Sequence, residues 1–426
     1  MRVLIILALS LVAAGETLTL RQAVEKAGEL SPEIAVARLK IVEAEALEGA
    51  AKASYKPQVE ANISMSRQTS NLQGIGLTFP GVPSRIGPYN VFNARPVLTQ
   101  TILDGGLISS IRAARAQFEQ NRYAADAVRE STQLTVLELY LQALQSGSHI
   151  EASRVRVETF RKTLQQAKDR EADGHASKLD LVRAEQELRQ EEVQLINNER
   201  DLNVLKTTLI RTIGLSNSDL ELVPLPTKNT LPPVIAESGS AVEEVRAEFQ
   251  ADQANIRKAE FELQKVKREH WPRIEASTDF GVLGQHPARN VSTYTYGVTA
   301  RIPIWTSGRI EKETLAAKAR LDQAKESQRQ TRLVIQEELR KSSIEWDAAS
   351  KAVESAEKAA ELAKENFELS TIRFEEGIST NLDAVVAQSR LAEAEDFAIR
   401  TRYDLLRARA RNARARGNVF LFFEGL

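Results

Sequence analysis

Apolar positions follow a helical period over most of the chain. Leucines recur every seven residues from Leu181 to Leu209, and apolar or small residues alternate by three and four from Val353 to Phe374. A 3.5-residue period makes neighbouring helices wrap around one another as in a coiled coil. The pattern predicts six helices, over residues 22–54, 107–173, 178–213, 241–270, 309–376 and 381–411.

The lengths of the predicted helices indicate how they pack. At ~1.5 Å per residue, the helix over 107–173 would be roughly 100 Å long. The two shorter helices over 22–54 and 178–213 sum to nearly the same length. We therefore expect this short pair to stack end to end beside the long helix. The second half of the chain allows the same arrangement.

Four other segments alternate apolar and polar residues with a period of two, which predicts strands of about ten residues with one apolar face each. A water-soluble sheet with one wet face would show the same alternation. However, this length also crosses a bilayer when the strand is tilted, and the connections over 69–89 and 284–290 have the composition of exposed loops. The four apolar sets are Val59, Ala61, Ile63 and Met65; Phe92, Ala94, Pro96 and Leu98; Ile274, Ala276, Thr278, Phe280 and Val282; and Tyr294, Tyr296, Val298, Ala300 and Ile302.

Four strands are too few to close a barrel, and an open sheet edge is not tolerated in lipid. Two chains would give eight strands, whose interior side chains fill, whereas three would give twelve strands and room for an aqueous lumen. We therefore predict an oligomer of at least three copies. Its apolar strand faces would contact lipid, and its polar faces would contact water.

Three segments of the chain recur in the same order, the longest of them at an offset of 203 residues. The segment 173–188, DGHASKLDLVRAEQEL, matches 376–391, EGISTNLDAVVAQSRL, and two further segments match in the same order. These are YKPQVEA (55–61) with HWPRIEA (270–276), and ILDGGLI (102–108) with IWTSGRI (304–310). Ordered matches of this kind indicate an internal duplication. We divide the chain into a first repeat at 16–213, a linker at 214–240, a second repeat at 241–411 and a tail at 412–426.

Composition and the N-terminal segment narrow the functional classes. Residues 1–15 combine Arg2, an apolar run and small residues, which is the pattern of a secretory signal peptide. The 57 basic and 58 acidic residues leave no surplus that would favour nucleic acid. No basic region precedes the leucine repeat, and the signal peptide pattern indicates export, so we do not expect a DNA-binding leucine zipper. The chain has no cysteine, its four histidines show no metal-ligand spacing, and we find no catalytic constellation. We expect no metal, no cofactor and no enzymatic activity.

Taken together, these features resemble the TolC-type outer-membrane efflux proteins. The resemblance rests on LTLRQAVEKAGELSPEIAVAR near the start, the paired strands, the ILDGG and IWTSG turns, and both glycine turns. It implies a mainly α-helical fold with a small β part: a homotrimer with a twelve-stranded β-barrel in the outer membrane and an α-helical barrel in the periplasm. A mixed equatorial region would come from 214–240 and the tail. The implied function is a passive exit duct of a tripartite efflux or type I secretion system in a Gram-negative envelope, docked to a periplasmic adaptor and an inner-membrane pump.

The two glycine turns are the candidate functional site. Gly174 and Gly377 suit the left-handed position that ends a helix. Ser177 with Asp180, and Thr380 with Asp383, each fit a capping box that starts the next helix. The resemblance implies that these turns form the periplasmic end of the channel, where the adaptor docks. Leu179 and Leu382 occupy the corresponding position in each turn.

The resemblance also places Asp383, and less directly Asp180, in a charged ring around the pore. Such a ring would attract cations, and crowded carboxylates would raise one another's pKa. The chain departs from the usual gate pattern, because Phe374 replaces a tyrosine, Val386 replaces a second acid and Ser379 replaces a basic residue. Apolar packing around Phe374 and Val386 is therefore an alternative gate. A periplasmic coiled-coil adaptor or structural protein remains the alternative function.

Overall fold

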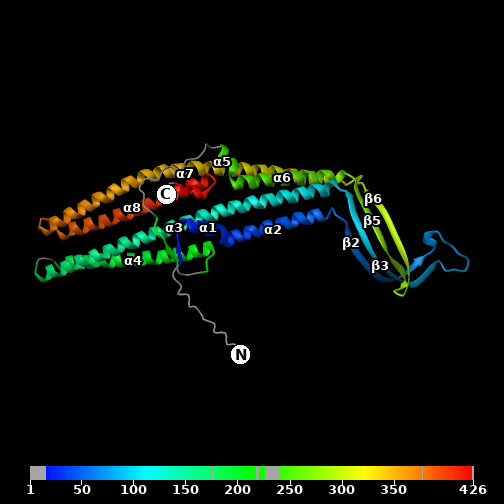
Figure 1. Cartoon of the computed structure of the whole chain (residues 1–426), viewed down its shortest axis with the longest axis horizontal. Coiled ribbons are helices and arrows are strands. Elements are labelled where there is room, and N and C mark those ends of the chain that lie inside the picture. Colours follow the sequence, from blue (N-terminus) through cyan, green and yellow to red (C-terminus); the bar gives the residue numbers. More distant parts are fainter. Residues whose placement is uncertain (1–15, 175–176, 217–219, 226–239, 377, 425–426) are drawn as a thin grey trace, which may run out of the picture. The chain divides into compact units, whose positions relative to one another are not determined.

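The computed structural model describes residues 16–174, 177–216, 220–225, 240–376 and 378–424 (Figure 1). The expected signal peptide at 1–15, Gly377 and most of the linker lie outside the described residues. Contacts divide the chain into two units. The helical unit comprises Met1–Arg38, Ala124–Phe249 and Thr331–Leu426, and the sheet unit comprises Leu39–Tyr123 and Gln250–Gln330.

The helices agree with the predicted periodicity, with two corrections. The predicted helix over 22–54 is two helices, because Pro32 lacks a backbone N–H and Ser31 before it adopts an extended conformation (φ −57°, ψ 130°). The predicted helix over 241–270 is likewise interrupted, at Arg246. The helices are α1 (Leu20–Leu30), α2 (Pro32–Ala53), α3 (Gly105–Ala172), α4 (Lys178–Ile213), α5 (Ser240–Val245), α6 (Ala247–Lys267), α7 (Arg309–Glu375) and α8 (Asn381–Ala415), with 3₁₀ turns η1 (Gln73–Ile75), η2 (Arg268–His270) and η3 (Val419–Phe423).

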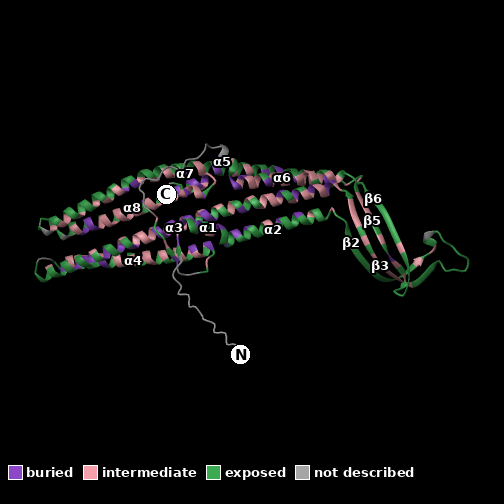
Figure 2. Cartoon of the chain, viewed as in Figure 1, coloured by how far each residue is buried: buried purple, intermediate pink, exposed green. Residues whose placement is uncertain are grey.

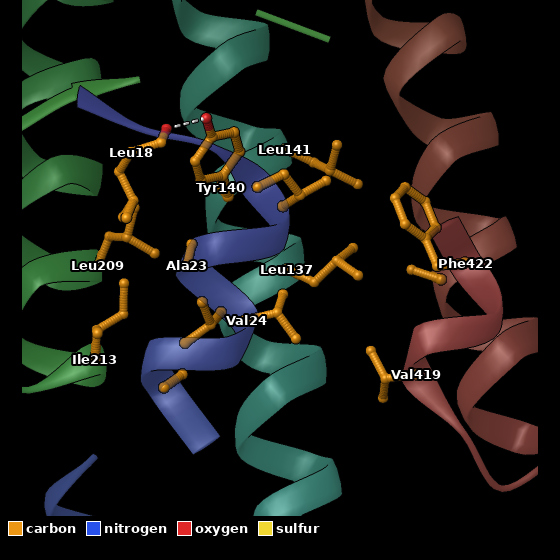
Figure 3. Packing of buried hydrophobic residues seen from close by; sticks show 14 of the residues in the cluster. Leu18, Ala23, Val24, Leu137, Tyr140, Leu141, Leu209, Ile213, Val419 and Phe422 are labelled. Carbon is orange, nitrogen blue, oxygen red and sulfur yellow. Dashed lines mark hydrogen bonds between the residues drawn. The ribbon is translucent and has the colours of Figure 1, made fainter. Parts of the chain in front are cut away.

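The largest apolar core lies in the helical unit (Figure 3). It joins α1, α3, the end of α4, α8 and η3 to two short parallel strands, β1 (Glu16–Leu18) and β4 (Leu220–Leu222). Tyr140 is fully buried there. Its hydroxyl lies 2.7 Å from the Leu18 carbonyl oxygen and accepts the N–H of Val223 at 2.9 Å. The resemblance implied a mixed equatorial region from 214–240 and the tail, and it did not include residues 16–30.

The short helices of the first half lie along α3 in the helical unit. Val24 of α1 packs with Leu137 of α3, and Leu188 of α4 is buried with α3 residues nearer the turn. Gly214, which ends α4 with φ 89°, sits so close to the α1–α2 junction that a Cβ atom there would lie 2.5 Å from the Leu30 carbonyl oxygen. The predicted end-to-end stacking is therefore present, and it requires glycine at the junction.

The sheet unit contains an antiparallel sheet of β2 (Gln58–Asn71), β3 (Arg85–Leu103), β5 (Arg273–His286) and β6 (Arg289–Arg301), in the order β2-β3-β5-β6 (Figure 1). The strands are longer than the predicted ten residues, and the connections are correspondingly shorter. Cross-strand hydrogen bonding extends each hairpin beyond its alternating residues into the Gly- and Asn-containing segments that the sequence predicts as loops. In the same unit, α6 packs on α7 through Ala259 and Leu321.

The strand register brings the four apolar sets onto one face of the sheet. Met65 pairs with Phe92 and Ala94 with Val282, while Phe280 pairs with Tyr294. The side chains of Ile63, Phe280 and Tyr296 are exposed on this face. Almost all residues of β2 and β6 are exposed (Figure 2). The opposite face is polar and carries an ion pair between Arg95 and Asp279, 3.0 Å apart. We call these two surfaces the apolar face and the polar face.

Among the described helices, none has both the length and the hydropathy needed to span a bilayer.

Candidate functional site at the hairpin turns

The first turn connects α3 to α4 in the helical unit. Gly174 has φ 78°, the left-handed conformation that glycine adopts without strain. Ser177 then caps α4: the Ser177 N–H donates to Asp180 Oδ2 at 3.1 Å, and the Asp180 N–H donates to Ser177 Oγ at 3.3 Å. This is the predicted capping box, which satisfies two backbone donors of the new helix. Leu179 is exposed in the first turn of α4.

The second turn connects α7 to α8 and repeats this local chemistry. The Thr380 N–H donates to Asp383 Oδ2 at 3.0 Å, and the Thr380 hydroxyl donates to the same oxygen at 2.7 Å. The Asp383 N–H completes the capping box on Thr380 Oγ1 at 3.4 Å. Leu382 is exposed in the first turn of α8, and Val386 is exposed one turn further along. Gly377 lies outside the described residues.

A cavity of about 460 Å³ lies between the two turns. Both hairpins line it, so the structure brings Asp180 of the first turn together with Phe374, Thr380 and Leu382 of the second. Ser379 also lines the cavity, and its buried Oγ has no hydrogen-bond partner among the described residues. The remaining lining residues are Thr163, Gln166, Ala167, Arg170 and Arg183. The cavity therefore combines apolar surface with hydroxyl groups and two guanidinium groups.

One contact across this cavity was not predicted from the sequence. The guanidinium carbon of Arg170, near the end of α3, lies 4.2 Å from the centroid of the Phe374 ring, near the end of α7. A cation at this distance over an aromatic face is attracted by the ring quadrupole. Arg170 and Phe374 thus join the last turns of the two long helices. A phenylalanine, which lacks the hydroxyl of the usual tyrosine, is able to make this contact.

Within one chain, the pKa of the Asp383 carboxyl is set by local hydrogen bonds and not by neighbouring carboxylates. The Thr380 hydroxyl, then the Thr380 backbone N–H and the charge of Arg373, hold the pKa of the Asp383 carboxyl below its ordinary value. The predicted rise in pKa requires carboxylates from neighbouring copies. At neutral pH the Asp383 carboxylate is accordingly ionised and remains available as a fixed negative charge.

A second tie between the hairpins lies farther from the turns. Arg156 of α3 is buried, and its Nε lies 2.9 Å from Glu191 of α4 while its Nη1 lies 3.3 Å from Asp396 of α8. His149 Nδ1 lies 3.0 Å from the same Asp396 carboxylate. Asp396 is thirteen residues after Asp383, which corresponds to ~20 Å along α8. The two hairpins are therefore joined firmly at this level and by Arg170 and Phe374 at the turns.

A buried cluster of charged residues lies at the junction between α5 and α6. Arg246 is fully buried, and its Nη1 donates to the Ala415 carbonyl oxygen at 3.0 Å while its Nη2 lies 2.9 Å from Glu338. Nearby, burial first and the charge of Glu248 second raise the pKa of Glu130 to about 7. The sequence pattern did not predict this cluster, because a charged residue in a helix is usually part of a solvent-exposed face.

A sequence profile of the family described as outer membrane efflux protein matches residues 23–215 and 240–418. A comparison with curated protein sequences found no significant match. Both described turns and both strand pairs fall within the two segments that the profile covers.

Solved structures share this fold. The CmeC outer membrane channel of Campylobacter jejuni superposes with a TM-score of 0.84 at 16% identity and covers 93% of this chain and 85% of that chain. A membrane protein from Pseudomonas aeruginosa gives a TM-score of 0.84 at 20% identity, with 93% of each chain covered. The open state of the Neisseria gonorrhoeae MtrE outer membrane channel gives 0.77 at 17% identity, with 94% and 89% covered. At such identities the superpositions establish a common fold and carry no residue-level role.

Proposed function

This chain belongs to the outer membrane efflux protein family, and from that premise we propose that three copies form one passive duct from a periplasmic adaptor to the exterior. As a family member, the chain is an outer-membrane efflux channel. In the proposal, an inner-membrane pump supplies the energy, and the chain itself catalyses no reaction. The two repeats, 16–213 and 241–411, each supply one strand pair and one helical hairpin. Residues 214–240 link the repeats and, with the tail at 412–426, form the equatorial region.

We infer the trimer from the sheet, which has four strands and two open edges. Within the described chain, β2 pairs only with β3 and β6 only with β5. The apolar face runs along all four strands, so the sheet suits lipid on one side. Lipid offers no hydrogen bonds to an open edge, and pairing β6 of one copy with β2 of the next satisfies both edges. Three copies of four strands close a twelve-stranded barrel with the polar face towards the lumen.

The hairpin turns are the proposed periplasmic mouth of this duct. The exposed side chains of Leu179 and Leu382 offer apolar contacts to an adaptor. Asp180 and Asp383 would contribute a negatively charged ring around the opening. In each copy, Arg170 on Phe374 holds the two turns together and so favours a narrow mouth.

The assembly is tested by cell fractionation and by the mobility of unheated and heated protein in gels. We expect the protein in the outer-membrane fraction as a trimer that dissociates on heating, and we expect ion-conducting pores when the trimer is added to planar bilayers. A soluble periplasmic monomer would refute the duct and favour the adaptor or structural protein. An outer-membrane trimer that conducts no ions would refute only the proposal that the lumen is open, and not the trimeric assembly.

A further inference from the structure

The loop end of the β2–β3 hairpin carries basic residues without acidic partners. Arg67 lies near the end of β2, and Arg85 begins β3. The sequence has no aspartate or glutamate between Glu60 and Asp104. Both guanidinium groups are exposed, and neither forms an ion pair within the described part of the chain. This end of the sheet therefore has uncompensated positive charge.

Both arginines lie on the apolar face. Arg67 follows Ile63 and Met65 at the two-residue interval that keeps side chains on one side of a strand. Gln68 and Ser70 both contact the hydroxyl of Tyr89, so these residues share the polar face. Asn71 then lies on the apolar face, and its cross-strand partner is Arg85.

The loop between the two arginines, residues 72–84, is apolar and uncharged. No charged residue occurs between Arg67 and Arg85, although 27% of the chain is charged. Leu77, Phe79 and Val82 are exposed by 44%, 54% and 46%. By contrast, β5 and β6 are joined by only two residues, 287–288. The apolar character of the strand face thus continues past the arginines into the loop.

We propose that this end of the hairpin binds the anionic surface of the surrounding membrane, with Arg67 and Arg85 on lipid phosphate groups and the loop 72–84 in the interfacial layer. The proposal rests on the proposed placement of the apolar face against lipid. Arginine at such a border keeps its stem on apolar surface while its planar guanidinium binds phosphate oxygens in pairs. An aqueous role would leave Leu77, Phe79 and Val82 in water and would give the two charges no partner.

The chain supplies a matched control for position on the sheet. Arg289 begins β6 at the same end and is also exposed. It lies two residues before Val291, which pairs with Leu283, and Leu283 pairs with Asn93 on the polar face. Arg289 therefore carries the same charge at the same end of the sheet, but it faces the opposite way.

The test compares Arg67→Gln, Arg85→Gln and Arg289→Gln in the full-length trimer. Each protein is released from mixed micelles of phosphatidylglycerol and phosphatidylcholine, and native mass spectrometry measures the ratio of the two bound lipids. We expect each of the first two variants to lose about fivefold in preference for phosphatidylglycerol, which corresponds to ~1 kcal/mol per arginine. Arg289→Gln should keep the wild-type preference.

Loop depth is measured independently. Because the chain has no cysteine, Phe79→Cys gives a single site for a nitroxide label. In vesicles of phosphatidylcholine and phosphatidylglycerol, we expect the label to be relaxed more by oxygen than by a water-soluble nickel complex. Greater relaxation by the nickel complex would overturn the interfacial loop.

An equal loss of lipid preference in Arg289→Gln, or no preference in the wild type, would overturn the arginine site. Trimer formation is scored on the same samples. Absence of the trimer would contradict the proposed duct, whereas an intact trimer without lipid preference contradicts only this inference.

Discussion

Replacing Arg170 by glutamine tests the contact that joins the two turns. Arg170→Gln removes the cation over the Phe374 ring and leaves a shorter, uncharged polar side chain. The tie through Arg156 and Asp396, ~20 Å farther along α8, remains in place. We therefore expect the ends of the hairpins to separate more readily while the trimer stays folded, and the mouth of the duct to widen.

The magnitude follows from the geometry. A cation at 4.2 Å from a ring centroid at a partly exposed site contributes about 0.5–1 kcal/mol. If the three copies of a trimer open together, the loss is ~1.5–3 kcal/mol per channel. This shifts the ratio of closed to open channels by about tenfold to about a hundredfold. The effect is large enough to be seen in single-channel recordings.

The assay is the open probability and conductance of purified trimers in planar bilayers. Arg183→Gln is the matched control, because Arg183 lines the same cavity and loses the same charge. Phe374→Tyr should behave as wild type, since it keeps the aromatic face, and Phe374→Leu should resemble Arg170→Gln. If Arg170→Gln leaves the open probability unchanged, or if Arg183→Gln raises it equally, the contact does not hold the mouth closed.

Three further variants probe other parts of the chain. Asp383→Asn should reduce cation selectivity, measured as the reversal potential in a salt gradient, without loss of trimers. An unchanged reversal potential in the variant would place Asp383 outside the conduction path. Tyr140→Phe removes the hydroxyl that binds Leu18 and Val223; it should cost about 1–3 kcal/mol of stability, seen as a lower Tm, and an unchanged Tm would contradict the role of that hydroxyl. The folded-state pKa of Glu130 is about 7, above its ordinary 4.5, so the stability it contributes is present at low pH and is lost as pH rises through about 7. Glu130→Gln should therefore raise Tm at alkaline pH more than at acidic pH, and equal changes in Tm at both would argue against burial of that charge.

Part of the candidate site could be predicted from the local sequence. A Ser/Thr followed three residues later by Asp specifies a capping box from neighbouring residues alone, and both boxes are present. The role of Arg170 could not be predicted, because a basic residue near a helix end is equally typical of a solvent-exposed face and of a contact with another helix. Its partner belongs to the other hairpin, and the helical period does not specify which residues of two separate hairpins meet.

The helix break at Ser31 has a signal in the sequence, which is the following proline. The prediction followed the apolar period instead and placed one continuous helix there. Pro32 disfavours the helical conformation of the preceding residue, yet the period continues smoothly across it. The strand β1 gave no such signal. Three residues form a strand there because β4 lies alongside and Tyr140 binds both segments.

The sequence by itself determined the type and order of the long helices and of the four strands of the large sheet, the internal duplication and the alternation of each of these strands, since period and capping depend on residues only a few positions apart. The tertiary structure decided which distant residues meet: the register that sets the four apolar sets on one face, the glycine fit of Gly214 against Leu30, and the pairing of Arg170 with Phe374. These depend on how whole helices and strands pack. A shift of one residue in register would reverse every side chain of a strand while leaving its local pattern unchanged.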